Sequence, residues 1–316
     1  MSYEQLAQHA ARIQQLAIQE SLKQRGWIEV DDDQIKPPPD VTQQIADGMV
    51  ASAERQFSIA VAMFEPFLTM PDPSRFQPMI DYLGAAMNTL SSGEGTTDPV
   101  NHVKVTANPG LDAMTTVSQK IEDWRGSAAV AFRQNFVEPF PAITANQFAL
   151  VATLNGAIEA EQALWAECRK NVDDIAEKAI KALEVMDECS HDDEVCVLTV
   201  ASSVFAVAAA LATGGAMIAL TVVGAAAQAQ SGVPAGNDPE VQFDGQTPEA
   251  IVNQVHDALN QLATLTNSNE QVIADALTAS AETLAANKAR FVSRRPALAD
   301  TTSATVTTSD GLGEAV

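Results

Sequence analysis

The stretch "IEDWRGSAAVAFRQNF" (Ile121–Phe136) decides the fold of this chain. Apolar residues recur at helical spacing before it, and small residues followed by Phe132 and Phe136 continue that spacing after it. Gly126 has no Cβ and can adopt the backbone conformation that a sharp turn requires. Trp124 provides a large flat surface for the gap where two helices diverge. The stretch therefore predicts two amphipathic helices joined by a turn at Trp-x-Gly.

Helical spacing of apolar residues extends outward from this turn over most of the 316 residues. A long second helix follows the turn, and the stretch "EPFP" interrupts it. The helical spacing then resumes and runs from about residue 142 to 188, roughly 70 Å at 1.5 Å per residue. Turn residues, prolines and capping residues divide the chain further, with Asp40 and Thr247 as expected N-caps. The predicted segments are an N-terminal helix with an acidic, Pro-rich linker (1–36), a helical hairpin (37–92), a flexible loop (93–110), the hairpin with the long second helix (111–188), an uncharged Ala/Gly-rich hydrophobic hairpin (189–237), a long C-terminal helix (247–293) and a disordered tail (294–316).

Composition points to the same fold class. The chain is 46% hydrophobic but only 5% aromatic, and Ala dominates it. Ala has the highest helix propensity and lets helices approach closely. We therefore expect an all-α fold, an elongated helical bundle built on long antiparallel helices with the Trp-x-Gly hairpin within it.

Charge excludes two classes of partner. The formal net charge is −23, so a nucleic-acid backbone and an anionic membrane surface would both repel the chain. The simplest role of this charge is to keep an apolar helical protein soluble. The N-terminus "MSYEQLAQHAARIQQLAIQE" lacks an apolar run with basic flanks, so we expect no signal peptide. The protein then stays in the cytoplasm or leaves the cell by a route that reads no such peptide.

The run "WRGSAAVAF" resembles the WxG superfamily (the early secretory antigenic target-like proteins) of type VII secretion substrates in actinobacteria. Trp124 and Gly126 match its two defining positions, and Ala128, Ala129 and Phe132 match the small and aromatic positions behind them. The close match covers about 15 residues, and the compatible hairpin covers about 111 to 188. The resemblance implies a helical hairpin exported without a cleaved signal peptide.

Two departures from the family pattern qualify this resemblance. The family's export signal is a Tyr followed four residues later by an acid, placed after the hairpin. Here Tyr3 and Tyr82 both precede the turn without such an acid, and Trp165 is followed at that spacing by Arg169. The second departure is "EPFP" (138–141), which should kink the second helix.

The resemblance implies a non-enzymatic protein that is exported by, or associated with, a type VII secretion system. It would assemble through helices with itself or with a co-secreted helical partner, and would be secreted or attached to the cell envelope. The alternative is a cytoplasmic or virion-associated helical scaffold.

The chain carries no charge from Val195 to Asn237. Val195–Thr213 is close to the length of a membrane-crossing helix, and Gly214 and Gly215 offer a hinge after it. A ladder of small residues favours tight helix–helix contact: Ser202, Ala206, Ala210 and Gly214. Two interpretations stay open. Residues 195–229 are a hairpin that enters membrane lipid, as in helical pore-forming toxins, or a hairpin that stays buried in a soluble bundle.

The stretch "CSHDDEVC" (189–196) is the one cluster with potential metal ligands. Cys189, His191 and Cys196, with Asp192 or Asp193, have donors that zinc accepts, but their spacing matches no standard zinc pattern. A disulfide between the two cysteines and a plain polar loop with unpaired thiols are the other interpretations, and the plain loop is preferred. No phosphate-binding loop, nucleophile elbow or metalloprotease helix is present. The sequence therefore predicts no enzyme, no bound metal or cofactor, and no small-molecule substrate.

Overall fold

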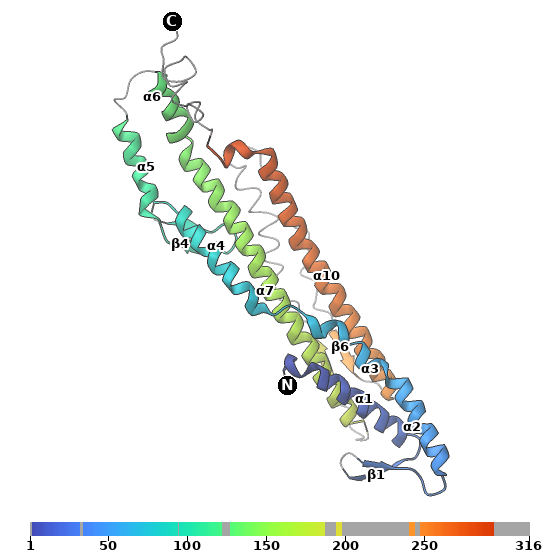
Figure 1. Cartoon of the computed structure of the whole chain (residues 1–316). Coiled ribbons are helices and arrows are strands. Elements are labelled where there is room, and N and C mark those ends of the chain that lie inside the picture. Colours follow the sequence, from blue (N-terminus) through green and yellow to red (C-terminus); the bar gives the residue numbers. More distant parts are fainter. Residues whose placement is uncertain are drawn as a thin grey trace, which may run out of the picture. The chain divides into compact units, whose positions relative to one another are not determined.

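The computed structural model describes residues 2–31, 34–93, 95–121, 127–186, 194–197, 240–243 and 247–293. These residues are mostly helical (Figure 1), which confirms the predicted helical class. The strands among them form short two-stranded antiparallel sheets. The chain falls into two compact units, each assembled from segments far apart in the sequence. Unit 1 comprises 1–76, 160–205 and 232–272, and unit 2 comprises 77–159, 206–231 and 273–316.

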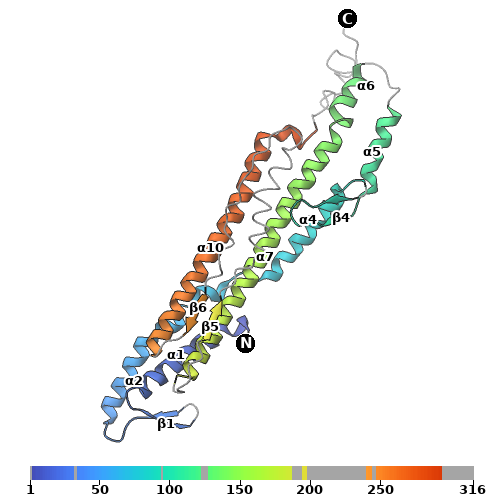
Figure 2. The ribbon, with the colours of Figure 1, turned by 180° about the vertical axis from the view of Figure 1, so that it is seen from behind.

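Unit 1 contains the N-terminal elements and parts of two long helices. Its own elements are the 3-10 turn Tyr3–Gln5, α1 (Leu6–Lys23), β1 (Ile28–Asp31), β2 (Gln34–Lys36), α2 (Gln43–Phe57), α3 (Ile59–Ala62), the 3-10 turns Glu65–Thr69 and Pro73–Phe76, β5 (Glu194–Val197) and β6 (Glu240–Phe243). Helices α7 (Phe140–Glu184) and α10 (Pro248–Ala286) contribute their residues 160–184 and 248–272. Figure 2, from behind, shows β5 and β6 side by side between these two helices.

The core of unit 1 forms where α1, α2, α3, α7 and α10 meet. The apolar stripe of α1 is buried there at the predicted positions Leu6, Ala10, Ile13 and Leu16. The largest fully buried side chains in this cluster are Leu6, Ile13, Leu22, Phe57, Phe64, Ile175, Leu183, Ile251 and Leu262. Burial of this apolar surface, at about 25 cal/mol per Å², is what holds these separate chain segments together.

The first helix ends earlier than predicted. Helix α1 stops at Lys23 instead of continuing to about residue 28, because Gly26 takes a positive φ of 93° and reverses the chain. The Trp27 N–H then donates to the Leu22 carbonyl oxygen. The acidic stretch that was expected to be a linker instead forms the antiparallel strands β1 and β2, in which Ile28 pairs with Lys36. The next helix also starts later than predicted, since Thr42, not Asp40, is the residue before α2.

Unit 2 contains the elements that surround the Trp-x-Gly stretch. They are α4 (Gln77–Leu90), β3 (Thr96–Thr97), β4 (Lys104–Val105), α5 (Pro109–Lys120), α6 (Ser127–Phe132), the π-helical turn Arg133–Val137, residues 140–159 of α7, residues 273–286 of α10 and the 3-10 turn Lys288–Arg290. The stretch 93–110, expected as a flexible loop, thus includes the β3–β4 hairpin and the start of α5. Asn108 caps α5, because its Oδ1 accepts from the Gly110 N–H at 2.9 Å.

A loop residue fixes the packing against α7 in unit 2. The Asp98 carboxylate accepts from the Val100 N–H at 2.7 Å and holds the loop that presents this valine. A Cβ added at Gly156 would lie 2.6 Å from the Val100 Cγ1. Any larger residue at this point of α7 would require Val100 to shift. Elsewhere in unit 2, Met87 of α4 packs with Phe148 of α7 in a small buried cluster.

The "EPFP" stretch interrupts the helical pattern as predicted, through a π-helical turn. The Glu138 N–H donates to the Arg133 carbonyl oxygen five residues earlier, at 3.0 Å. A proline ring clashes with the carbonyl four residues before it, and proline has no N–H to donate. The wider turn before Pro139 and Pro141 adapts the backbone to both effects, and α7 begins at Phe140.

The start of α10 is predicted correctly from its cap. Thr247 Oγ1 accepts from the Ala250 N–H at 3.2 Å, and Pro248 takes the first helical position. In unit 2, the residues that follow α10 are hydrogen-bonded to α7. The side-chain amides of Asn146 and Gln147 donate to the carbonyl oxygens of Arg290 and Phe291 at 2.9 and 2.7 Å.

Candidate functional site

The Trp-x-Gly stretch lies between two helices of unit 2. Helix α5 ends at Lys120, earlier than the expected break at Arg125 and Gly126, and α6 begins at Ser127; α5 contacts the turn Arg133–Val137 that follows α6. Figure 1 shows α5 and α6 on the two sides of the connection. Trp124 and Gly126 themselves lie outside the described residues, as does the side chain of Ala128. A helix thus lies on each side of the stretch where a turn is expected.

The residues behind the turn differ in their environment. Ala129 is buried, as close helix approach requires. Phe132, expected to fill the seam between the helices, is instead 39% exposed. Its ring stacks on Phe136, with centroids 5.6 Å apart and planes 16° from parallel. Such a stacked pair lies one helical turn apart on the surface, and it presents an apolar spot beside the turn.

The other sites predicted from the sequence fall in the part of the chain that the structure leaves undescribed. These are the small-residue ladder with its hinge (Ser202, Ala206, Ala210, Gly214, Gly215) and the cluster residues Cys189, His191, Asp192 and Asp193. The backbone of Cys196 lies in β5, opposite Val241 of β6. Among the described residues there is no group of three metal-binding side chains. In that same part of the chain, every helix is too short or too polar to span a membrane.

The β5–β6 pair places the two ends of the uncharged segment together. Val197, the last residue of β5, pairs with Glu240, the first residue of β6. The described residues on either side of the segment 198–239 are therefore neighbours in unit 1. This connection was not predicted, because a four-residue strand next to a long apolar run has no distinct periodicity of its own.

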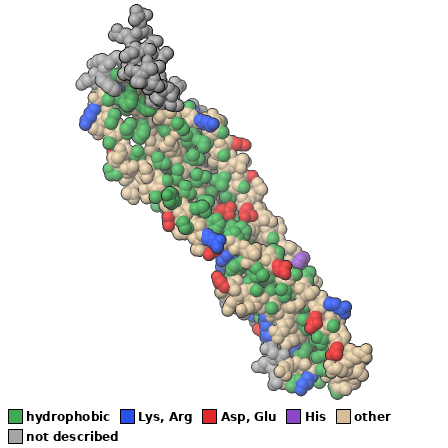
Figure 3. All heavy atoms as spheres, viewed as in Figure 1, with side chains coloured by type: hydrophobic (Ala, Val, Ile, Leu, Met, Phe, Trp, Pro, Cys, Tyr) green, Lys and Arg blue, Asp and Glu red, His purple; other side chains and the backbone are tan. Residues whose placement is uncertain are grey.

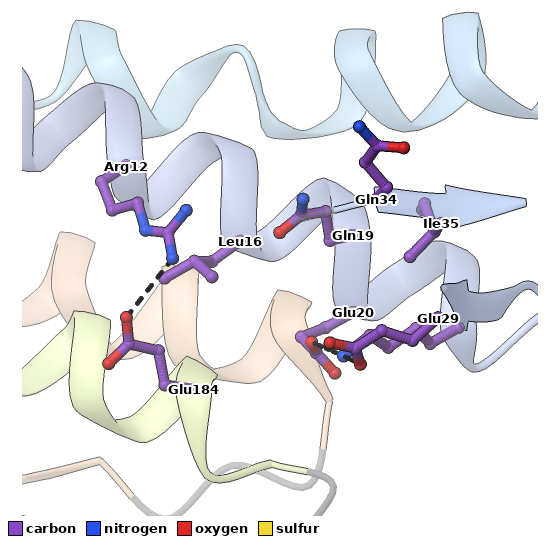
Figure 4. Close-up of a pocket in the computed structure, with 9 residues that line it drawn as sticks. Arg12, Leu16, Gln19, Glu20, Glu29, Gln34, Ile35 and Glu184 are labelled. Atoms are coloured by element: carbon purple, nitrogen blue, oxygen red, sulfur yellow. Dashed lines mark ion pairs between the residues drawn. The ribbon is translucent and has the colours of Figure 1, made fainter. Parts of the chain in front are cut away.

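A charged pocket of about 260 Å³ lies in unit 1 between α1, the β1–β2 hairpin and the end of α7 (Figure 4). Its lining consists of Arg12, Leu16, Gln19, Glu20, Lys23, Glu29, Gln34, Ile35 and Glu184. This pocket could not be predicted from the sequence, because its lining residues come from three separate segments.

Ion pairs inside the pocket account for its charges. The Lys23 ammonium lies 2.8 Å from Glu20 Oε1 and 2.6 Å from Glu29 Oε2, and Glu20 is almost fully buried. The guanidinium of Arg12 lies 3.5 Å from Glu184 Oε1. These pairs hold the β-hairpin and the end of α7 on α1. Because acids and bases here neutralise one another, the arrangement suits a structural clamp better than proton transfer or anion binding.

A second pocket in unit 1, about 320 Å³, is mainly apolar. Met70, Trp165 and Cys168 are among its lining residues. The Cys168 thiol contacts the Met70 sulfur at 3.3 Å and accepts from the Thr266 hydroxyl at 3.4 Å. Burial raises the pKa of this thiol, so it stays protonated at neutral pH and is a poor nucleophile. The pocket is therefore packing around a buried thiol, and it lacks the chemistry of a cysteine enzyme.

Arg169 organises the wall of this second pocket. Its guanidinium carbon lies 4.3 Å from the centroid of the Tyr3 ring, and its Nη2 donates to the Met70 carbonyl oxygen at 2.8 Å. The Tyr3 hydroxyl donates to the Phe67 carbonyl oxygen at 2.5 Å. Burial raises the pKa of the Tyr3 phenol, against the opposing effect of Arg169. Arg169 thus links α7 to the N-terminus and to the loop that follows α3.

Three comparisons find no match. The chain matches no protein-family model, no curated protein and no solved structure. Neither pocket brings together a nucleophile, a base and an oxyanion-binding group. The feature that remains is the pair of helices, α5 and α6, that flank the Trp-x-Gly stretch.

Proposed function

We propose that this chain is a non-enzymatic helical protein of a type VII secretion system, acting through assembly of its helices. In this proposal the Trp124–Gly126 turn closes a WxG-type hairpin of α5 with α6 and α7. The long antiparallel helices α7 and α10 form the frame of a bundle. The protein leaves the cell by the type VII route without a cleaved signal peptide.

The observation that carries this proposal is the position of the two helices around the motif. A helix ends just before Trp124, another begins just after Gly126, and the first contacts the turn that follows the second. The motif positions thus fall where a helical hairpin needs a bend. A chance Trp-x-Gly inside a single helix or strand would not have this placement.

Export is tested in the native host, with and without a functional type VII apparatus. We expect the protein in the culture filtrate of the wild type and at least tenfold less in the apparatus-null strain. Trp124→Ala should reduce the filtrate level as well, because the hairpin loses the side chain that fills its bend. Ile45→Ala, which removes an exposed apolar side chain on α2, is the matched control and should leave export unchanged. Equal amounts in the two filtrates, with a cytoplasmic marker confirming intact cells, would contradict the proposal.

Membrane insertion of the uncharged segment is a second candidate function, favoured by the register of β5 with β6. Residues 198–237 carry no charge, and the residues that flank the segment 198–239, Val197 and Glu240, pair with each other in unit 1. A hairpin attached in this way can enter a bilayer while its two ends remain at the same place on the protein. Its length permits two arms of helix, as a membrane hairpin requires.

Dye-loaded liposomes test this second function. We expect leakage with the unmodified protein and a loss of leakage with Ala206→Asp, because a charge near the middle of a membrane helix costs about 2.5–3.5 kcal/mol. The matched control is Ala62→Asp, which adds the same charge at an exposed position of α3. Absence of leakage at every pH and lipid composition, or equal leakage by both variants, would count against insertion.

A further inference from the structure

Two carboxylates of unit 2 lie close together where the β3–β4 loop packs on α7. Asp98 begins this loop and is 2% exposed, and its carboxylate accepts from the Val100 N–H. Val100 in turn packs on Gly156 of α7, where an added Cβ would lie 2.6 Å from the Val100 Cγ1. Glu159 follows Gly156 by three residues, on the same side of the helix. It is close enough to Asp98 for the charge of that carboxylate to act on it.

These two carboxylates lack the partners that usually neutralise acids. Figure 3 shows Asp and Glu side chains spread over the surface of one face of the protein, several of them next to Lys or Arg. Among the described residues, neither Asp98 nor Glu159 forms an ion pair with lysine or arginine. Burial raises the pKa of both carboxyls, and the Asp98 charge raises the pKa of Glu159 further. Their negative charge therefore favours a cation beside them.

A buried amide oxygen next to Glu159 has no hydrogen-bond donor. Asn155 is 5% exposed, and its Nδ2 donates to Glu159 Oε1 at 2.7 Å. The Oδ1 atom of the same amide is buried and has no partner in the described part of the chain. Leaving a buried acceptor unpaired is unfavourable, so this oxygen points to a ligand that the chain itself does not supply.

We propose that Asp98, Asn155 and Glu159 hold a calcium ion between the β3–β4 loop and α7. Ca²⁺ accepts carboxylate, amide and water oxygens together, in flexible geometry, whereas Mg²⁺ requires a near-octahedral site and gives up its water reluctantly. The hydrogen bond from Asn155 to Glu159 Oε1 leaves the second carboxylate oxygen, Oε2, available to the ion. Water would complete the coordination shell.

The ligand set predicts weak binding. It has an amide where a tighter site would have a third carboxylate, so we expect a Kd of about 10⁻⁴–10⁻³ M, the range of extracellular calcium modules. The net charge of −23 favours the approach of any cation. This inference does not depend on the proposed secretion route, because it concerns contacts within unit 2 alone.

Isothermal titration calorimetry of the purified full chain tests the site, after removal of metal ions with EDTA and dialysis into KCl. The KCl screens diffuse attraction of cations to the acidic surface. We expect one saturable Ca²⁺ site and at least tenfold weaker binding of Mg²⁺. Hydrogen exchange of the Val100 amide should slow when Ca²⁺ is added, because the ion fixes the loop on α7.

Two variants should change binding in opposite directions. Glu159→Gln should weaken Ca²⁺ binding at least tenfold, because glutamine still accepts from Asn155 but carries no charge. In EDTA its melting temperature should equal or exceed that of the unmodified protein, since one of two repelling carboxylates is gone. Asn155→Asp should bind Ca²⁺ at least threefold more tightly and melt at a lower temperature in EDTA, because it adds a third carboxylate.

Asp112→Asn is the matched control. The Asp112 carboxylate also accepts from a backbone N–H, that of Gly93 at 3.1 Å, but it belongs to α5, outside the site, so Ca²⁺ binding should stay unchanged. Absence of saturable Ca²⁺ binding would overturn the inference, and so would equal binding by Glu159→Gln. An Asn155→Asp protein that binds no more tightly would contradict the ligand set. Weakening by Asp112→Asn would show diffuse binding to the acidic surface, and a preference for Mg²⁺ would refute the choice of calcium.

Discussion

Replacing Phe64 with Ala lowers the free energy of unfolding by about 3–5 kcal/mol, the usual cost of removing a buried aromatic side chain. Phe64 is fully buried, at 0% exposure, in the junction between α3 and the 3-10 turn Glu65–Thr69. It belongs to the cluster in which α1, α7 and α10 meet. Because these helices come from three distant segments, the cavity left by the ring weakens contacts between all of them. The stability of a typical domain is only about 5–15 kcal/mol, so this loss is a large part of the total.

Guanidinium unfolding followed by circular dichroism gives the measurement. Leu68→Ala is the control, because Leu68 lies four residues further along the same segment but is 42% exposed. Its removal should cost well under 1 kcal/mol. If the two variants unfold at the same denaturant concentration, the segment 64–68 does not pack in unit 1 as the structure has it.

Replacing Arg169 with Met lowers the free energy of unfolding by about 2–3 kcal/mol, the sum expected for a charged hydrogen bond and a cation–π contact. The substitution keeps an apolar side chain of similar length in place. It removes the contact with the Tyr3 ring and the hydrogen bond to the Met70 carbonyl oxygen. Limited proteolysis should then cut the loop 66–72 faster, because the loop loses one of its anchors.

Arg55→Met is the control for Arg169→Met. Arg55 lies on α2, is exposed and donates only within its own helix, to the Ala51 carbonyl oxygen, so its loss should change stability by less than about 0.5 kcal/mol. A double-mutant cycle with Tyr3→Leu then separates the ring contact from the hydrogen bond. Strict additivity of the two changes would show that the cation–π contact contributes nothing.

Elements with a strong local signal could be predicted from the sequence. The long helices α7 and α10 follow from the 3.6-residue spacing of their apolar residues, and the start of α10 follows from Thr247 and Pro248. The gap between α5 and α6 follows from the small and turn-forming residues around Gly126. In each case the residues that determine the structure are neighbours in the chain.

The rest depends on contacts between distant residues. The β1–β2 hairpin passes through an acidic stretch with prolines after it, and its position on α1 depends on Lys23 bridging Glu20 and Glu29. The contacts of Arg169 include the ring of Tyr3, which lies far from it in the sequence. Phe132 carries the spacing of a buried residue but lies on the surface, because position on a helical face does not say whether another element covers that face. A single sequence gives no measure of such pairings.

The pairing of Val197 with Glu240 also has an evolutionary consequence. A segment that enters and leaves through one antiparallel pair behaves like a long hairpin loop, and a hairpin loop can be shortened or exchanged without rerouting the chain on either side. Related proteins that keep the helices of unit 1 can therefore differ freely in the length of this segment, down to a tight turn joining β5 directly to β6.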